Sequence, residues 1–176
     1  MKSFSSLSLV GLFCLMACSS SQSGDLAANG VTGRAPASQV QRLSSDEQVF
    51  LVKINQLRAQ NGLAELALDP VLQKSSAAHS EYMNSIDYLT HDEPPPNLAS
   101  WDRIANAGGD FNYTGENIAC GNASGDKTFT QWYNSPGHLA NMLSPNFKYI
   151  GIARAGSDAE ALSKNCPYFW TTDFGG

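Results

Sequence analysis

The spacing of apolar residues predicts a helix that begins near residue 44 and ends at Gly62. Apolar side chains recur at intervals of three and four residues, at Phe50, Ile54 and Leu57. Residues 44–47 read Ser-Ser-Asp-Glu, the pattern of a capping box, and the glycine provides a stop signal. One face of this helix is therefore expected to pack against a core.

A second helix is predicted from the dipeptide Asp69-Pro70, which supplies an N-cap and a proline at the first helical position. Its inward stripe contains Leu72, His79 and Met83 at helical spacing. The pattern therefore turns His79 toward the interior, among apolar neighbours.

The rest of the chain alternates short helices with turns and ends in strands. Residues 91–96 read His-Asp-Glu-Pro-Pro-Pro and must form a loop, because each proline removes a backbone donor and restrains the preceding residue. Further helices are expected from Ser100, around Phe129 to Tyr133, and from Ser135-Pro136, and strands at 147–153 and 168–174. Early helices and a late antiparallel pair of strands predict an α+β fold, with helices covering a small sheet.

The N-terminal segment predicts export. Residues 1–17 carry one cation, Lys2, and an apolar run shorter than the roughly 20 residues that span a bilayer, as in a signal peptide. The run ends Leu-Met-Ala before Cys18 and resembles a bacterial lipobox, so Cys18 is the candidate for lipidation. By resemblance to bacterial sorting signals, the serine that follows favours the outer membrane. The alternative is an ordinary signal cleaved near Ala17, which gives a secreted or periplasmic protein.

The chain of 176 residues has room for one folded domain. Residues 18–43 contain no aromatic residue and are predicted to be a flexible tether, which leaves 44–176 as the domain. The net charge of -5 and pI of about 5.0 lack the positive charge that drives nucleic-acid binding. We therefore expect no nucleic-acid partner.

Two cysteines remain for the folded domain once Cys14 leaves with the signal and Cys18 carries lipid. In an oxidising compartment Cys120 and Cys166 are expected to form a disulfide. Closing a loop of this length stabilises a fold by about 4 kcal/mol in the chain-entropy model. A two-cysteine metal site is the weaker alternative, because neither cysteine belongs to a Cys-x-x-Cys pair.

Four segments occur in an order that resembles a known family. They are Ala-Ala-His-Ser-Glu-Tyr-Met at 77–83, Gly-Glu-Asn-Ile-Ala at 115–119, Trp-Tyr-Asn-Ser-Pro-Gly-His-Leu-Ala-Asn-Met-Leu at 132–143, and Phe-Trp-Thr-Thr-Asp-Phe-Gly at 169–175. Together they resemble the CAP superfamily, or SCP domain, and most closely its short bacterial secreted branch. The resemblance covers residues 46–175. It implies a three-layer α-β-α sandwich with a small, mainly antiparallel sheet, and a surface cleft where two histidines and two glutamates meet.

Carried over residue by residue, the resemblance assigns His79 as the first histidine, Glu116 as the acid and His138 as the second histidine. Ser135 stands where animal and plant members have the second glutamate, so any mechanism that needs two carboxylates lacks one of them. Two neutral imidazoles, His79 and His138, could hold Zn²⁺ or another divalent cation together with water. Glu116 could orient a histidine or polarise a metal-bound water. The alternative is a hydrogen-bonded polar network that only joins helices to the sheet.

Other polar and aromatic residues are interpreted as structural. His91 could border the cleft, but an exposed loop histidine is the favoured interpretation, and Ser135 is favoured as a helix cap. Asp173, Asn117 and Asn141 are expected to bond to loops. The core is expected to include Trp132, Tyr133, Phe169 and Trp170.

These features favour a non-catalytic, cell-envelope binding module over an enzyme. Its partner would be a small apolar ligand or an envelope component held in the cleft, and a lipid on Cys18 would attach it to the membrane. The alternative is a metal-assisted hydrolase of peptide or envelope polymer, with Glu116 as the acid–base residue. A surface adhesin or scaffold, which would not use the histidines, is a third class. No Gly-x-Ser-x-Gly motif surrounds Ser80 or Ser135, which argues against a serine hydrolase.

Overall fold

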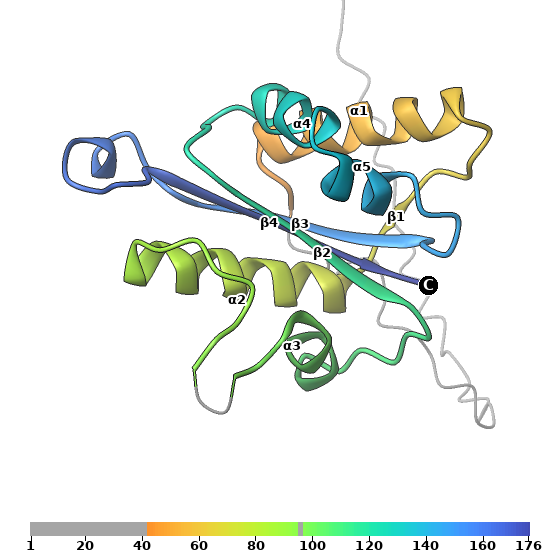
Figure 1. The fold of residues 1–176 in the computed structure, drawn as a ribbon, viewed down its shortest axis with the longest axis horizontal. Helices are drawn as coiled ribbons and strands as arrows, with labels where there is room; N and C mark the ends of the chain where they lie inside the picture. Colours follow the sequence, from red (N-terminus) through yellow and green to blue (C-terminus); the bar gives the residue numbers. More distant parts are fainter. Residues whose placement is uncertain (1–41, 95–96) are drawn as a thin grey trace, which may run out of the picture. The chain divides into compact units, whose positions relative to one another are not determined.

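The computed structural model describes residues 42–94 and 97–176, and the domain architecture below refers to these residues (Figure 1). The predicted signal peptide, Cys18 and nearly all of the predicted tether lie outside them. Within the described ranges, no helix is both long and apolar enough to cross a membrane.

A four-stranded sheet in the order β1-β3-β4-β2 forms the middle layer. The strands are β1 (Ala67–Leu68), β2 (Thr114–Cys120), β3 (Tyr149–Gly156) and β4 (Tyr168–Gly175). Strand β1 runs parallel to β3, and the other two pairings are antiparallel. Strand β4 lies between β3 and β2 and is buried along its whole length.

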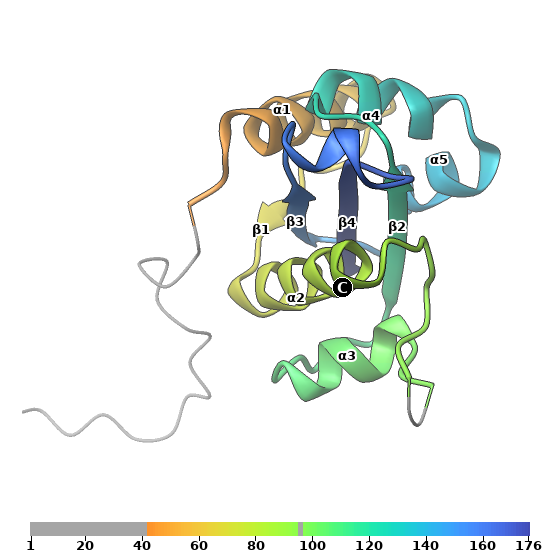
Figure 2. The same cartoon turned by 90° about the vertical axis from the view of Figure 1, so that its left-hand side faces the viewer.

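Helices cover both faces of this sheet (Figures 1 and 2). One face carries α2 (Pro70–Ile86) and α3 (Ser100–Asn106), and the other carries α1 (Ser45–Gln60), α4 (Gly125–Tyr133) and α5 (Pro136–Met142). A short 3-10 helix, η2 (Glu160–Leu162), lies in the connection between β3 and β4. The predicted α-β-α sandwich is confirmed.

The two long helices begin where their capping residues place them. At α1 the Ser44 hydroxyl accepts the Glu47 N–H and the Glu47 carboxylate accepts the Ser44 N–H, which completes the capping box. At α2 the Asp69 carboxylate accepts the N–H groups of Val71 and Leu72. The second oxygen of Glu47 accepts the Arg154 N–H of β3 and so ties the start of α1 to the sheet.

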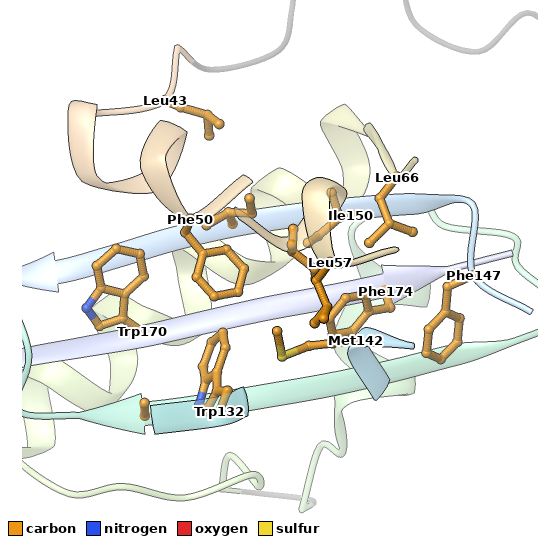
Figure 3. Close-up of a cluster of buried hydrophobic side chains, with 13 residues drawn as sticks. Leu43, Phe50, Leu57, Leu66, Trp132, Met142, Phe147, Ile150, Trp170 and Phe174 are labelled. Atoms are coloured by element: carbon orange, nitrogen blue, oxygen red, sulfur yellow. The ribbon is translucent and has the colours of Figure 1, made fainter. Parts of the chain in front are cut away.

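The larger apolar core lies between the sheet and the α1, α4 and α5 layer (Figure 3). Phe50 lies at its centre, with ring centroids 5.1 Å from Trp132 in an edge-to-face arrangement and 6.3 Å from Trp170. All three side chains are fully buried. Tyr133 was predicted to join them, but it is 48% exposed, because it faces outward on the last turn of α4.

The opposite face of the sheet has a smaller apolar cluster and many buried polar groups. Met83, Ile118 and Phe169 form that cluster together with Cys166. The predicted disulfide between Cys120 and Cys166 is confirmed, and it joins the end of β2 to the segment that leads into β4. Helix α2 lies so close to β3 that a Cβ added at Gly151 would come within 2.1 Å of the Leu72 backbone. Glycine therefore permits the close contact that brings the polar face of α2 onto the sheet.

Two strands were not predicted. Strand β2 follows a Gly-rich turn and reads Thr-Gly-Glu-Asn-Ile-Ala-Cys, which contains few of the residues that favour strands, and its pairing with β4 forms it. Strand β1 has only two residues, too few to show the alternation of polar and apolar side chains that identifies a strand. Helix α3 is capped at Ala99 and not at Ser100, because the Asp102 carboxylate accepts the Ala99 N–H at 3.3 Å.

Candidate functional site

The candidate site lies along β2, the edge strand of the sheet, and its acid is Glu116. Side chains alternate between the two faces of a strand, so Glu116 and Asn117 point in opposite directions. Glu116 faces the layer of α2 and α3, and the Asn117 amide donates to the His138 carbonyl of α5 at 3.1 Å. The edge strand thus brings residues from both helical layers to one place.

His79 lies completely buried beneath this edge, on the inward face of α2 as predicted. Its Nδ1 is 2.8 Å from the Glu93 carboxylate and its Nε2 is 2.9 Å from the Thr90 carbonyl. The Glu116 carboxylate lies 3.9 Å from the same Nε2. Both ring nitrogens therefore face acceptor oxygens, and His79 holds the loop that follows α2.

Glu116 is almost fully buried and is surrounded by cationic groups. Its Oε2 forms an ion pair and hydrogen bond with Arg103, and its Oε1 lies 2.7 Å from His91 Nδ1. Burial alone would raise the pKa of Glu116, but the hydrogen bond with His91 and the charges of Arg103 and His79 outweigh it. The pKa of Glu116 is therefore lowered, and the site contains an ionised carboxylate.

His91 is the solvent-facing partner of Glu116, and its side chain is 59% exposed. The hydrogen bond to Glu116 raises the pKa of His91 above its ordinary value, against the opposing effect of partial burial. The sequence favoured an exposed loop histidine, and His91 is indeed exposed, but its contact with Glu116 was not predicted. His-Asp-Glu immediately before a rigid run of prolines was the signal that could have identified it.

His138 and Ser135 meet on the other side of β2. His138 Nδ1 is 2.7 Å from Ser135 Oγ, and the ring stacks on Trp132 with centroids 5.9 Å apart. Burial lowers the pKa of His138, and the nearby charge of His91 lowers it further. Ser135 occupies the N-cap position of α5, as expected, but its side chain makes no capping bond, because it is paired with His138 instead.

Two asparagines fix α5 to the edge strand. The Asn141 amide donates to the Glu116 carbonyl at 3.0 Å and to the Asn117 side-chain oxygen at 2.9 Å. Together with the bond from Asn117 to the His138 carbonyl, these contacts place His138 beside the strand that carries the acid. Both asparagine side chains were expected to hydrogen-bond to loops, but they join helix α5 to strand β2.

Arg103 and Glu93 belong to the site, and neither was identified from the sequence. Arg103 Nη1 donates to the carbonyl oxygens of His91 at 2.7 Å and Leu98 at 2.8 Å, while Nη2 binds Glu116. Arg103 is 7% exposed and lies on α3, close to both ends of the loop that carries His91. A single guanidinium therefore pairs with the acid and also binds the backbone of His91 and Leu98.

Asp173 of β4 is a second buried carboxyl group beside Glu116. It was expected to bond to loop backbone, but its Oδ2 accepts from Ser76 Oγ of α2 at 3.1 Å, because α2 packs directly on this strand. Complete burial raises the pKa of Asp173 well above its ordinary value, and the charge of Glu116 raises it further. Asp173 is thus a neutral neighbour of the ionised acid.

The site as arranged does not offer a free set of metal ligands. Both nitrogens of His79 face oxygens, and both oxygens of Glu116 are taken by Arg103 and His91. In the described part of the chain, no group of three or more His, Cys, Asp or Glu is placed to hold a metal ion. The expected pair of zinc ligands, His79 and His138, therefore does not fit this geometry, because both ring nitrogens of His79 already face the oxygens of Glu93 and Thr90.

Comparison with protein families places most of the chain in one family. Residues 51–174 match the model of the cysteine-rich secretory protein family, CAP. Two proteins of Bacillus subtilis are similar: the uncharacterized protein YkwD, 34% identical over 69% of this chain, and the uncharacterized membrane protein YlbC, 28% identical over 72%. The matched regions span 45% of YkwD and 36% of YlbC, so both relatives are much longer than the shared domain.

Solved structures show the same fold. An extracellular protein containing an SCP domain from Bacillus anthracis is 28% identical, with a TM-score of 0.63 over 74% of this chain and 40% of that one. An outer surface protein from Borrelia burgdorferi is 23% identical, with a TM-score of 0.65 over 74% of this chain and 91% of that one. The family match, the shared sandwich and the Gly-Glu-Asn strand that carries Glu116 lead to one conclusion: the chain belongs to the CAP, or cysteine-rich secretory protein, family.

Proposed function

We propose that this protein is an exported CAP-domain module of the cell envelope that binds an envelope component at the edge of its sheet, without catalysis. The observation that carries the proposal is the pair formed by His91 and Glu116. The pair faces solvent through His91, lies beside His138 and is backed by Arg103. Such a site offers fixed charged and hydrogen-bonding groups to a polar partner.

The contacts within the site favour binding over turnover. Glu116 has both oxygens engaged, so it has no free position from which to take a proton from a substrate water. Ser135 is paired with His138 Nδ1, but the other hydrogen bond of that imidazole is with the backbone of Ile118, not with the acid side chain that completes a Ser-His-Asp triad. The polar character of the edge also favours an envelope component over a small apolar ligand.

The N-terminal sequence and the relatives support export. Residues 1–17 have the pattern of a signal peptide, and Cys18 follows a lipobox-like segment. A similar solved protein is described as extracellular, and a curated relative as a membrane protein. We propose an outer-membrane lipoprotein attached through Cys18, with a cleaved secreted or periplasmic form as the alternative.

A sedimentation assay with purified peptidoglycan sacculi tests the binding function. The wild-type protein should co-sediment with the sacculi, and His91→Ala should lose most of this binding while it still unfolds cooperatively at a temperature well above that of the assay. Lys164→Ala, a change far along the chain on the β3–β4 connection, is the matched control and should bind like wild type. Equal sedimentation of wild type and His91→Ala would overturn the proposal.

The same preparation distinguishes the hydrolase alternative. Release of soluble muropeptides that requires added Zn²⁺, and that disappears in Glu116→Gln, would replace the binding module with a metal-assisted hydrolase. We expect no release above the level of sacculi alone, with Zn²⁺ or with a chelator.

A further inference from the structure

The segment before β2 contains a sequence pattern that neither the sandwich nor the edge site uses. Residues 112–114 read Asn-Tyr-Thr, the Asn-x-Thr pattern of an acceptor for N-linked glycosylation in an exported protein. The pattern occurs a second time at residues 122–124, as Asn-Ala-Ser. So short a pattern also arises by chance, and the structure around each asparagine therefore decides which one a transferase can use.

Asn112 lies on the surface with its amide free. The residue is exposed and belongs to a bend immediately before β2, next to Tyr113, whose side chain is 54% exposed. Within residues 42–94 and 97–176, no hydrogen bond involves the Asn112 amide or the Thr114 hydroxyl. Both groups of the pattern are therefore available to an enzyme without the loss of a hydrogen bond.

The chain on both sides of Asn112 is held in place. On one side the Phe111 ring packs so closely against Gly175 that an added Cβ would come within 2.7 Å of the ring. On the other side Tyr113 exchanges two backbone hydrogen bonds with Gly176, each 3.0 Å long. Asn112 lies between these contacts with its side chain in solvent, so a sugar attached to it adds no atoms to the core.

The second asparagine, Asn122, is engaged by its surroundings. Its amide donates to Gln131 Oε1 of α4 at 2.8 Å, and its carbonyl accepts from Trp170 Nε1 at 2.6 Å. Ser124, the hydroxyl residue of this pattern, is the N-cap residue of α4. A transferase would have to break these contacts, so Asn122 provides an internal comparison for Asn112.

We propose that Asn112 is a site of N-linked glycosylation and that Asn122 is not. The reaction joins the Asn112 amide nitrogen to the anomeric carbon of a sugar. It breaks the bond between that carbon and the diphosphate of a polyprenyl-linked oligosaccharide, which leaves as polyprenyl diphosphate, and the amide proton passes to a base of the transferase. The proposal rests on the proposed export of the chain, because acceptors of this kind belong to secreted proteins.

Asp110 adds a charge beside the acceptor. It is exposed, lies two residues before Asn112 and forms no ion pair in the part of the chain that the structure describes. The second pattern has Cys120 at the corresponding position, and that residue is bound in the disulfide. A transferase with a basic acceptor groove would therefore also favour Asn112.

Peptide mapping of the full chain, purified from the cells that produce it, tests the assignment. Trypsin alone leaves both asparagines in one peptide, residues 104–127, and a second cleavage after Glu116 separates them. Electron-transfer fragmentation keeps a glycan on its side chain, and it should place a sugar on Asn112 in the peptide 104–116 and none on Asn122. An unmodified peptide 104–116, in molecules that have lost residues 1–17, would overturn this proposal alone. Molecules that retain residues 1–17 would contradict export and this proposal together.

Variants separate an N-linked site from other modifications. Asn112→Gln and Thr114→Ala should each remove the sugar from the peptide 104–116, although the second variant keeps the asparagine, and Thr114→Ser should retain the sugar. Ser124→Ala, which destroys the second pattern, is the matched control and should leave the glycan mass unchanged. A sugar that persists in Asn112→Gln would be attached to another residue, and this result would overturn the proposal.

Discussion

Glu116 and Asp173 are directly opposite each other in the register of β2 and β4, yet their pKa values are displaced in opposite directions. Opposed residues in an antiparallel pair have side chains on the same face, with Cβ atoms about 4.5–5.5 Å apart. Two carboxylates this close do not both ionise readily, and the cationic groups surround Glu116. Glu116 therefore carries the charge, and Asp173 carries the proton.

Replacing Asp173 by asparagine should stabilise the protein at neutral pH. The pKa of Asp173 is raised in the folded state, so above its ordinary value of 3.8 the unfolded chain releases a proton that the folded chain retains. This difference in proton binding lowers the free energy of unfolding as pH rises. Asparagine does not titrate, so the substitution removes this pH-dependent loss, and its side-chain oxygen can still accept the hydrogen bond from Ser76. Chemical denaturation at pH 7 and pH 4 measures the effect, and the gain should shrink at the lower pH.

Ser76→Ala serves as the matched control for this change, because it removes the hydroxyl group that bonds to Asp173 and leaves the titrating carboxyl in place. It should be less stable than wild type at both pH values. A lower stability of Asp173→Asn at pH 7 would mean that the carboxyl is ionised in the fold.

The pair of His91 and Glu116 should contribute most to stability in mildly acidic solution. The pKa of His91 is raised, so its contribution is complete below 6.5 and is lost as pH rises through the higher folded value. The pKa of Glu116 is lowered, so its contribution is present above 4.5 and is lost as pH falls through the folded value. The difference in unfolding free energy between wild type and His91→Gln should therefore peak between these limits.

Salt provides the control for that measurement. Since His91 is mostly exposed, the peak should become smaller as ionic strength rises, while the stability difference outside the peak stays constant. A difference that does not depend on pH would show that the two groups are not paired in solution.

The long elements were predictable because their signals are local. The capping box at Ser44 and the Asp-Pro pair at residue 69 fixed the starts of α1 and α2, and both helices carry an apolar stripe. Strand β2 has no such signal. Its Glu116 and Asn117 are polar because they carry the site, and the pairing with β4 that makes it a strand is a long-range contact.

The candidate site was predictable in part, for the same reason. Glu116 and His138 belong to sequence motifs and were therefore identified as candidates. The helical spacing predicted that His79 points inward, and the structure buries it with an oxygen atom beside each ring nitrogen. Arg103 and Glu93 were not identified from the sequence. An arginine in a short predicted helix and a glutamate before a run of prolines are usually exposed to solvent, so neither residue stood out. Only the fold, in which Arg103 bonds to the carbonyl groups of His91 and Leu98 and to the Glu116 carboxylate, brings them together.

Removing Arg103 should destabilise the domain through Glu116. Arg103→Met leaves a buried carboxylate without its main partner and frees the carbonyl groups of His91 and Leu98, a loss of about 3–5 kcal/mol by analogy with other broken buried pairs. In the Glu116→Gln background the same change should cost less. A double-mutant cycle by urea denaturation measures the coupling, and strict additivity would contradict the pairing.

Replacing His79 should loosen the loop that carries His91. His79→Ala removes a fully buried ring that faces Glu93 and the Thr90 carbonyl, and we expect a loss of about 2–4 kcal/mol. Amide hydrogen exchange should rise at residues 90–93 and stay unchanged in β3. His138→Ala, on the other side of β2, is the matched control and should leave exchange in this loop unaltered.

Gln73 of α2 completes the open edge of β3, where the two-residue strand β1 has already ended. Its side-chain amide donates to the Ile152 carbonyl at 2.5 Å, and its oxygen accepts the Ile152 N–H at 3.0 Å, as a neighbouring strand would. Gln73→Leu leaves both backbone groups buried without partners, at about 1–3 kcal/mol each. Thermal unfolding should therefore show a large loss of stability. Gln56→Leu, at an exposed position of α1, adds the same apolar side chain without opening an edge, so a loss of equal size in both variants would show that the amide does not protect β3.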